Sequence, residues 1–123
     1  MSDIITSMSY DSSLNLVLVK LTGSASSTDV INNYHTIINF ANERNSRKLL
    51  VDVTELRHRY AAVEVIDVML AIKKDLTGFK LARVVGFDGY LHDLLIQNAK
   101  RFALDAENFE CFKQAKIWLE KAA

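Results

Sequence analysis

Short apolar runs alternate with longer segments of helical periodicity along this chain, and that alternation limits the folds open to it. The strand-like runs are residues 4–10, 14–21, 49–53, 81–87 and 109–112. Apolar side chains recur at helical spacing in residues 30–41, 61–76, 91–102 and 114–122. Strands alternating with helices predict a largely parallel sheet covered by helices, and the short turn after the first strand makes one pair antiparallel. We therefore predict an α/β fold, a mixed five-stranded sheet with one antiparallel strand, flanked by four helices.

Size and charge exclude several function classes. The 123 residues fit one domain, 1–123, and half of them are apolar, which is enough for a core. Fifteen basic and fifteen acidic residues give no net charge, so no overall basic field attracts nucleic acid or an anionic membrane. We expect no transmembrane segment and no signal peptide, because no long apolar run occurs. The single cysteine, Cys111, excludes an internal disulfide and fits a reducing cytoplasm, where we place the protein.

Polar residues mark the ends of the predicted helices. Ser26, Ser27 and Thr28 can each cap the first helix, and Asp29 suits its first turn. Gly78 is typical of the residue that follows a helix C-terminus.

The stretch KLLVDVTELRHRY contains the main candidate site. Its apolar half predicts a strand, which leads into four consecutive side chains, Arg57, His58, Arg59 and Tyr60. Loops at the carboxyl ends of parallel strands commonly hold binding sites in α/β proteins. Two guanidinium groups beside the start of the next helix would bind an anion or a partner protein.

The same region has a structural alternative. Its arginines would then be solvated and would pair with nearby acids such as Glu55 or Glu64. Asp52, inside the apolar strand, is either an acid with a shifted pKa or a carboxylate that accepts hydrogen bonds at the strand edge. Asp88 either caps the third helix or lines the same crevice. The sequence leaves these alternatives open.

No catalytic or metal-binding constellation is recognisable in the sequence. The three histidines have no paired metal-ligand spacing, and Cys111 has no cysteine nearby. Because Cys111 lies in the last predicted strand, we expect it to be buried. The four glycines form no nucleotide-binding loop. We therefore expect no catalytic residue, no metal and no cofactor.

Three segments resemble the SpoIIAA-like fold, which STAS domains (anti-sigma-factor antagonists) and CRAL-TRIO domains share. They are LLVDVTEL at 49–56, LARVVGFDGYLHDLLIQNAKRF at 81–102 and FECFKQAKIWLEKA at 109–122. The resemblance covers nearly the whole chain and is nearest to an uncharacterised bacterial branch. It implies a non-enzymatic regulatory module that binds a protein partner, here through Arg57 to Tyr60 and the start of the following helix.

One departure from that resemblance concerns the phosphate switch. Phospho-switched STAS domains carry a serine pair shortly after the strand that corresponds to LLVDV. No serine or threonine lies between Glu55 and Ala62, and Thr54 precedes the family position. Phosphorylation needs a hydroxyl to add its charge, so this switch is not expected at this segment.

An alternative function is a carrier or sensor of a small apolar or amphiphilic, lipid-like ligand, as the likeness to CRAL-TRIO domains implies. The pocket or interface would be lined by Val65, Met69, Leu91 and Leu95, and Arg59 would meet an anionic head group. An enzyme is a third hypothesis, for which the sequence offers only scattered acids and histidines.

The second predicted helix also carries apolar residues in excess of one buried stripe. The buried stripe is predicted to contain Ala62, Val65, Ile66, Met69, Ile72 and Leu76, whereas Val63, Val68 and Leu70 lie off it. This excess is either further core or the edge of an apolar pocket or a dimer interface, and it is the best indication of association in the sequence.

Overall fold

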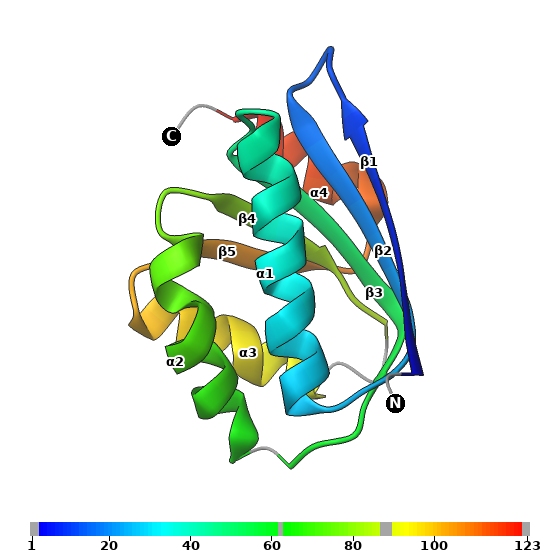
Figure 1. Cartoon of the computed structure of the whole chain (residues 1–123). Helices are drawn as coiled ribbons and strands as arrows, with labels where there is room; N and C mark the ends of the chain where they lie inside the picture. Colours follow the sequence, from blue (N-terminus) through cyan, green and yellow to red (C-terminus); the bar gives the residue numbers. More distant parts are fainter. Residues whose placement is uncertain (1–2, 62, 87–89, 122–123) are drawn as a thin grey trace.

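The computed structural model of the chain describes residues 3–61, 63–86 and 90–121 (Figure 1). Strands and helices alternate along the chain, as predicted. The strands are β1 (Asp3–Asp11), β2 (Leu16–Ala25), β3 (Lys48–His58), β4 (Lys80–Val84) and β5 (Asp105–Phe109). The helices are α1 (Ser27–Glu43), α2 (Glu64–Leu76), α3 (Tyr90–Arg101) and α4 (Phe112–Glu120).

The described strands form one mixed sheet in the order β1-β2-β3-β4-β5. β1 pairs antiparallel with β2, and every other neighbouring pair is parallel. α1, α2 and α3 lie on one face of the sheet and α4 lies on the other (Figure 1). The predicted fold class, with five strands and four helices among the described residues, is confirmed.

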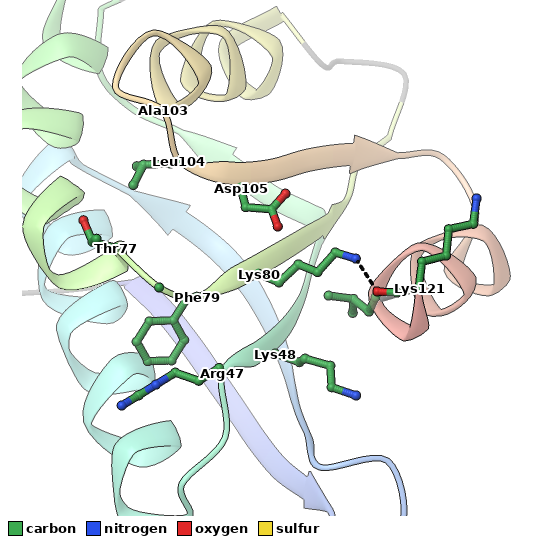
Figure 2. A pocket seen from close by; sticks show the side chains of 11 residues that line it. Arg47, Lys48, Thr77, Phe79, Lys80, Ala103, Leu104, Asp105 and Lys121 are labelled. Atoms are coloured by element: carbon green, nitrogen blue, oxygen red, sulfur yellow. Dashed lines mark hydrogen bonds between the residues drawn. The ribbon is translucent and has the colours of Figure 1, made fainter. Parts of the chain in front are cut away.

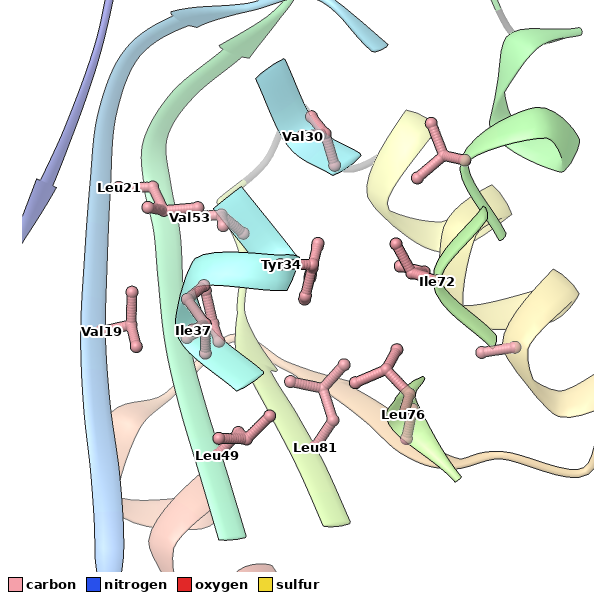
Figure 3. Close-up of a cluster of buried hydrophobic side chains, with 14 of the residues drawn as sticks. Val19, Leu21, Val30, Tyr34, Ile37, Leu49, Val53, Ile72, Leu76 and Leu81 are labelled. Carbon is pink, nitrogen blue, oxygen red and sulfur yellow. The ribbon is translucent and has the colours of Figure 1, made fainter. Parts of the chain in front are cut away.

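Alternation of side chains along the central strands builds two cores. The larger core lies under α1, α2 and α3 (Figure 3). The central strands β2 and β3 supply it with every second residue: Val17, Val19, Leu21, Leu49, Val51 and Val53. The intervening Leu16 and Leu50 pack under α4 with Ala115 and Leu119. Strands buried on both faces give nearly continuous apolar runs, which is why these two were recognisable in the sequence.

α1 begins with a reciprocal cap. Ser26 is the N-cap, and its Oγ accepts a hydrogen bond from the Asp29 backbone N–H at 3.2 Å. The Asp29 carboxylate accepts the Ser26 N–H in return, at 3.0 Å. Two of the amide donors that a helix start leaves without partners are thereby satisfied. Of the three predicted capping residues, the structure selects Ser26.

β3 is longer than predicted. The sequence placed its end at residue 53, but the strand continues to His58. Its last residues pair with the end of β2, where Ser24 lies opposite Arg57 and Ala25 opposite His58. A register shift near Thr22 absorbs one extra residue of β3, as a β-bulge does. The polar composition of this part hid the strand, because its backbone pairing does not depend on apolar side chains.

The predicted position of the last strand is wrong, because the strand begins and ends earlier in the chain. β5 spans Asp105–Phe109, in register with β4, rather than residues 109–112. Ala106 is its one fully buried side chain among the described residues, so the strand has no apolar alternation to reveal it. Cys111 is the exposed N-cap residue of α4, and the prediction that it is buried in a strand is wrong.

Two lysines at the amino ends of β3 and β4 contact the C-terminal end of α4. Lys80 Nζ donates to the carbonyl oxygens of Trp118 at 2.6 Å and Lys121 at 3.1 Å. Lys48 Nζ donates to the Leu14 carbonyl at 2.9 Å and to Glu120 at 3.4 Å. The last carbonyls of a helix lack intrahelical partners and carry partial negative charge, so these ammonium groups stabilise the docked helix.

We predict that Lys80→Met lowers the free energy of unfolding by about 1–3 kcal/mol, because it removes charged hydrogen bonds to α4 but keeps an aliphatic stem. Urea unfolding measures the change. Lys116→Met is the matched control: Lys116 is a lysine of α4 whose ammonium lies over the Phe112 ring, and its loss should cost less than about 0.5 kcal/mol. Equal stability of Lys80→Met and wild type would show that Lys80 does not hold α4.

Candidate functional site

The predicted cationic site lies at the carboxyl end of β3, but most of it is strand rather than loop. Arg57 and His58 are the last residues of β3, paired with β2. The Arg59 N–H then donates to the Ala25 carbonyl at 2.7 Å, which extends the contact between the two strands. The backbone of the segment is therefore fixed by the sheet, and its side chains point in different directions.

Arg59 is engaged in an ion pair with the start of α1. Its Nη2 lies 3.8 Å from Asp29 Oδ2, the carboxylate that also caps α1. Glu55 and Glu64, the acids named from the sequence, have other partners. Glu55 pairs with Lys20 at 3.1 Å, and Glu64 accepts the Ala61 N–H at 2.9 Å. Arg59 thus pairs with an acid, as the structural alternative expected, but the acid is Asp29 rather than Glu55 or Glu64.

Arg57 differs from Arg59. It alternates with the buried Leu56, so its side chain is exposed on the opposite side of the strand. No acid of the described residues forms an ion pair with it within 4.0 Å. Arg57 is therefore available to an external anionic group. The side chain of His58 lies outside what the structure describes.

Tyr60 turns inward and belongs to the larger core. Burial raises the pKa of its phenol well above the usual value, because a phenolate is poorly solvated there. The Arg83 charge acts in the opposite direction, and Tyr34 and Glu64 raise the pKa further. Tyr60 is therefore a protonated, neutral side chain at physiological pH, and it cannot act as a base or as an exposed recognition residue.

Arg83 is a buried charged residue that was not among the predicted site residues. It lies in β4 with only 1% of its surface exposed. Its neighbours Ala82 and Val84 pack in the core under α4, so Arg83 points to the face covered by α1, α2 and α3. A guanidinium stays charged in proteins, and burial of a charge is costly without compensating groups. An arginine at the centre of LARVV was the available signal.

Two other candidate groups have structural partners. Asp52 accepts hydrogen bonds from the Thr54 N–H at 3.0 Å and the Thr54 hydroxyl at 2.7 Å, as the strand-edge alternative predicted. The same contact occupies Thr54, the hydroxyl nearest to the position of the STAS switch. Asp88 lies outside the described residues.

The predicted ligand pocket is only partly within the described residues. Val65 and Met69 are buried in the larger core. The side chains of Leu91 and Leu95 lie outside what the structure describes. A pocket formed by these four residues therefore remains a prediction.

α2 carries an exposed apolar surface. Val63, Ile66 and Leu70 have 75%, 41% and 52% of their surfaces exposed. The sequence had placed Ile66 on the buried stripe and Val68 off it, but Val68 is fully buried. α2 packs against both α1 and α3, which widens its buried face to include Val68 and leaves Ile66 outside. We call Val63, Ile66 and Leu70 the α2 surface.

The described residues contain no group of three metal-ligating side chains that could hold a metal ion. Within the same residues, no helix is both long enough and apolar enough to cross a membrane.

The architecture is similar to that of a crystal structure of an uncharacterized protein from the DUF3478 family with a SpoIIAA-like fold, from Shewanella loihica PV-4. The alignment covers 94% of this chain and 93% of that chain, with a TM-score of 0.58 and 21% identical residues. The chain has a SpoIIAA-like fold. No protein-family model matches the chain, and no curated protein matches it. The likeness therefore establishes the SpoIIAA-like fold and leaves the function to be argued from the chain itself.

The raised pKa of Tyr60 predicts a loss of stability in alkali. The folded protein holds this proton more tightly than the unfolded chain, whose tyrosine ionises near pH 10. The contribution is complete below pH 10 and decreases above it, by up to about 1.4 kcal/mol per pH unit.

Tyr60→Phe should therefore flatten the decline in the free energy of unfolding between pH 10 and pH 11, measured with urea. Tyr10→Phe, at a part-exposed tyrosine that bonds Asn15, should keep the decline of wild type. The same slope in wild type and Tyr60→Phe would contradict the burial of the Tyr60 phenol.

Proposed function

We propose that this protein is a non-enzymatic regulatory module that binds a protein partner through the α2 surface. The SpoIIAA-like fold is compatible with this role, and the exposed aliphatic side chains of α2 are the observation that carries it. Arg57, at the end of the strand that leads into α2, adds a cation for an acidic group of the partner.

The spacing of the α2 surface suits a contact with another protein. Val63, Ile66 and Leu70 are separated by three and four residues, which places them along one side of α2 and its N-cap. Complete burial of such a side chain contributes about 1.5–3 kcal/mol. A contiguous exposed apolar surface on a small protein is typical of an interaction site.

Arg57 and Arg59, at and just after the end of β3, favour a contact that does not depend on a phosphate switch. Arg59 is held by Asp29, whereas Arg57 has no ion pair among the described residues. No serine or threonine lies between Glu55 and Ala62, the Tyr60 phenol is buried, and Thr54 bonds Asp52. We therefore propose that binding does not require phosphorylation of this segment.

Site-specific photo-cross-linking in cells tests the proposed surface. A photo-reactive residue at position 70 should cross-link a partner, whereas the same residue at position 117 should not. Ile117 is an equally apolar, 45% exposed residue of α4, on the other face of the sheet. Cross-links of equal yield at both positions would count against the α2 surface.

The identified partner then allows a quantitative prediction. Leu70→Glu should weaken its affinity by at least about tenfold, because a charge replaces a side chain that binding would bury. Ile117→Glu should bind as wild type does, and circular dichroism checks that both variants are folded. Arg57→Ala should mainly slow association and reduce its dependence on salt. Wild-type affinity of Leu70→Glu would refute the proposal.

A second copy of the chain is the alternative partner. Sedimentation velocity distinguishes it: a wild-type dimer that Leu70→Glu converts to a monomer would identify the α2 surface as a homodimer interface.

A further inference from the structure

A cavity of about 340 Å³ lies at the amino ends of β3, β4 and β5 (Figure 2). It is at the opposite end of the sheet from Arg57 and shares no residue with the α2 surface. Its volume is within the range of small-molecule binding sites. The proposed protein interaction does not account for it.

The cavity has an apolar base. Phe79 and Leu119 are buried, and Leu104 is part-buried at the start of β5. Gly78 lies at the edge with φ of +90°, and a Cβ placed on it would have no atom within 4 Å. The site is therefore open beside Gly78, and a bound molecule could cover the apolar side chains from that direction.

The charge around this base is strongly uneven. Among the described lining residues, Arg47, Lys48, Lys80 and Lys121 are basic and Asp105 is acidic. The chain as a whole has fifteen residues of each sign. Lys48 and Lys80 are direct partners in the register of neighbouring parallel strands, which lie about 4.8 Å apart. Both lysines therefore add positive charge to the same end of the sheet.

Part of this charge is already used by α4. Lys80 donates to two carbonyls of the end of α4, and Lys48 to Leu14 and Glu120, so each ammonium retains little capacity for further bonds. Glu120 also offsets the charge of Lys48, and both lysine side chains extend toward α4 (Figure 2), so neither ammonium is placed to contact a ligand beside Arg47.

Arg47 is the cation best placed to bind a ligand directly. One of its nitrogens, Nη1, donates to Asn42 Oδ1, and the guanidinium lies 4.9 Å from the centre of the Phe79 ring. These two contacts fix the position of the guanidinium beside Phe79, which lines the cavity. A guanidinium has five N–H donors, so the others can form the two parallel hydrogen bonds that suit a carboxylate or a phosphate.

We propose that this cavity binds a small organic anion, a molecule that joins a phosphate or carboxylate group to an apolar body. The anionic group meets Arg47, and the apolar body rests on Phe79 and Leu104, which lie on the same side of the sheet as Arg47 (Figure 2). The cavity volume limits the ligand to about the size of a mononucleotide.

Titration of the ¹⁵N-labelled chain, followed by amide chemical shifts, tests this site. The probes are AMP, citrate and inorganic phosphate, which separate a phosphate ester, a carboxylate and the bare anion. We expect saturable shifts at residues 77–80 and 103–105 with AMP or citrate, at lower concentration than with inorganic phosphate. The absence of a saturable shift at these residues with all three probes at millimolar concentration would overturn the proposal.

Substitutions of Arg47 and Lys116 distinguish a specific anion-binding site from nonspecific electrostatic attraction. Arg47→Gln should weaken binding about 10- to 100-fold, the range for losing hydrogen bonds to a charged group. Arg47→Lys keeps the charge but loses the planar guanidinium with its paired donors, so its affinity should lie between those of wild type and Arg47→Gln. Lys116→Gln makes the same charge change outside the cavity and should bind as wild type does. Unchanged binding by Arg47→Gln, or an equal loss in Lys116→Gln, would overturn the assignment.

Discussion

Burial of both faces of β3 is the constraint on which the rest of the structure depends. Leu49, Val51 and Val53 pack under α1, α2 and α3, and Leu50 packs under α4. Each such side chain contributes about 1.5–3 kcal/mol when it is buried. Loss of either helical layer would expose one row of these residues. The helices of both faces are therefore needed together to keep β3 buried.

The two ends of the sheet use charge in different ways. At the carboxyl end, Arg83 and Tyr60 are buried in the core. The ion pair of Arg59 with Asp29 connects the end of β3 to the start of α1. At the amino end, Lys48 and Lys80 lie side by side and contact α4. Most of the conspicuous charges thus stabilise the SpoIIAA-like fold. The α2 surface and the proposed anion site share no residue with each other. An experiment that refutes one proposal therefore leaves the other untouched.

Part of the candidate site was visible in the sequence and part was not. The sequence correctly indicated Ser26 among the caps of α1 and an apolar excess on α2, whereas the cationic segment remains a predicted site. It did not reveal that Tyr60 is buried or that Arg59 pairs with Asp29, because that ion pair joins residues 30 positions apart. Arg83 was overlooked although it interrupts an apolar strand. Ile66 and Val68 exchanged places between surface and core because α2 packs against both α1 and α3, which no local pattern of α2 reports.

The sequence by itself determined the order of strands and helices and the mixed character of the sheet. Those properties follow from apolar periodicity and turn residues, which act over a few neighbouring positions. Only the tertiary structure decided the end of β3 at His58, the position of β5 and the exposure of Cys111. These features depend on backbone pairing with strands that are distant in the chain. Polar side chains are compatible with such pairing but give no apolar pattern from which it could be predicted. The cavity at the amino ends is of the same kind, because it exists only where three strands and α4 meet.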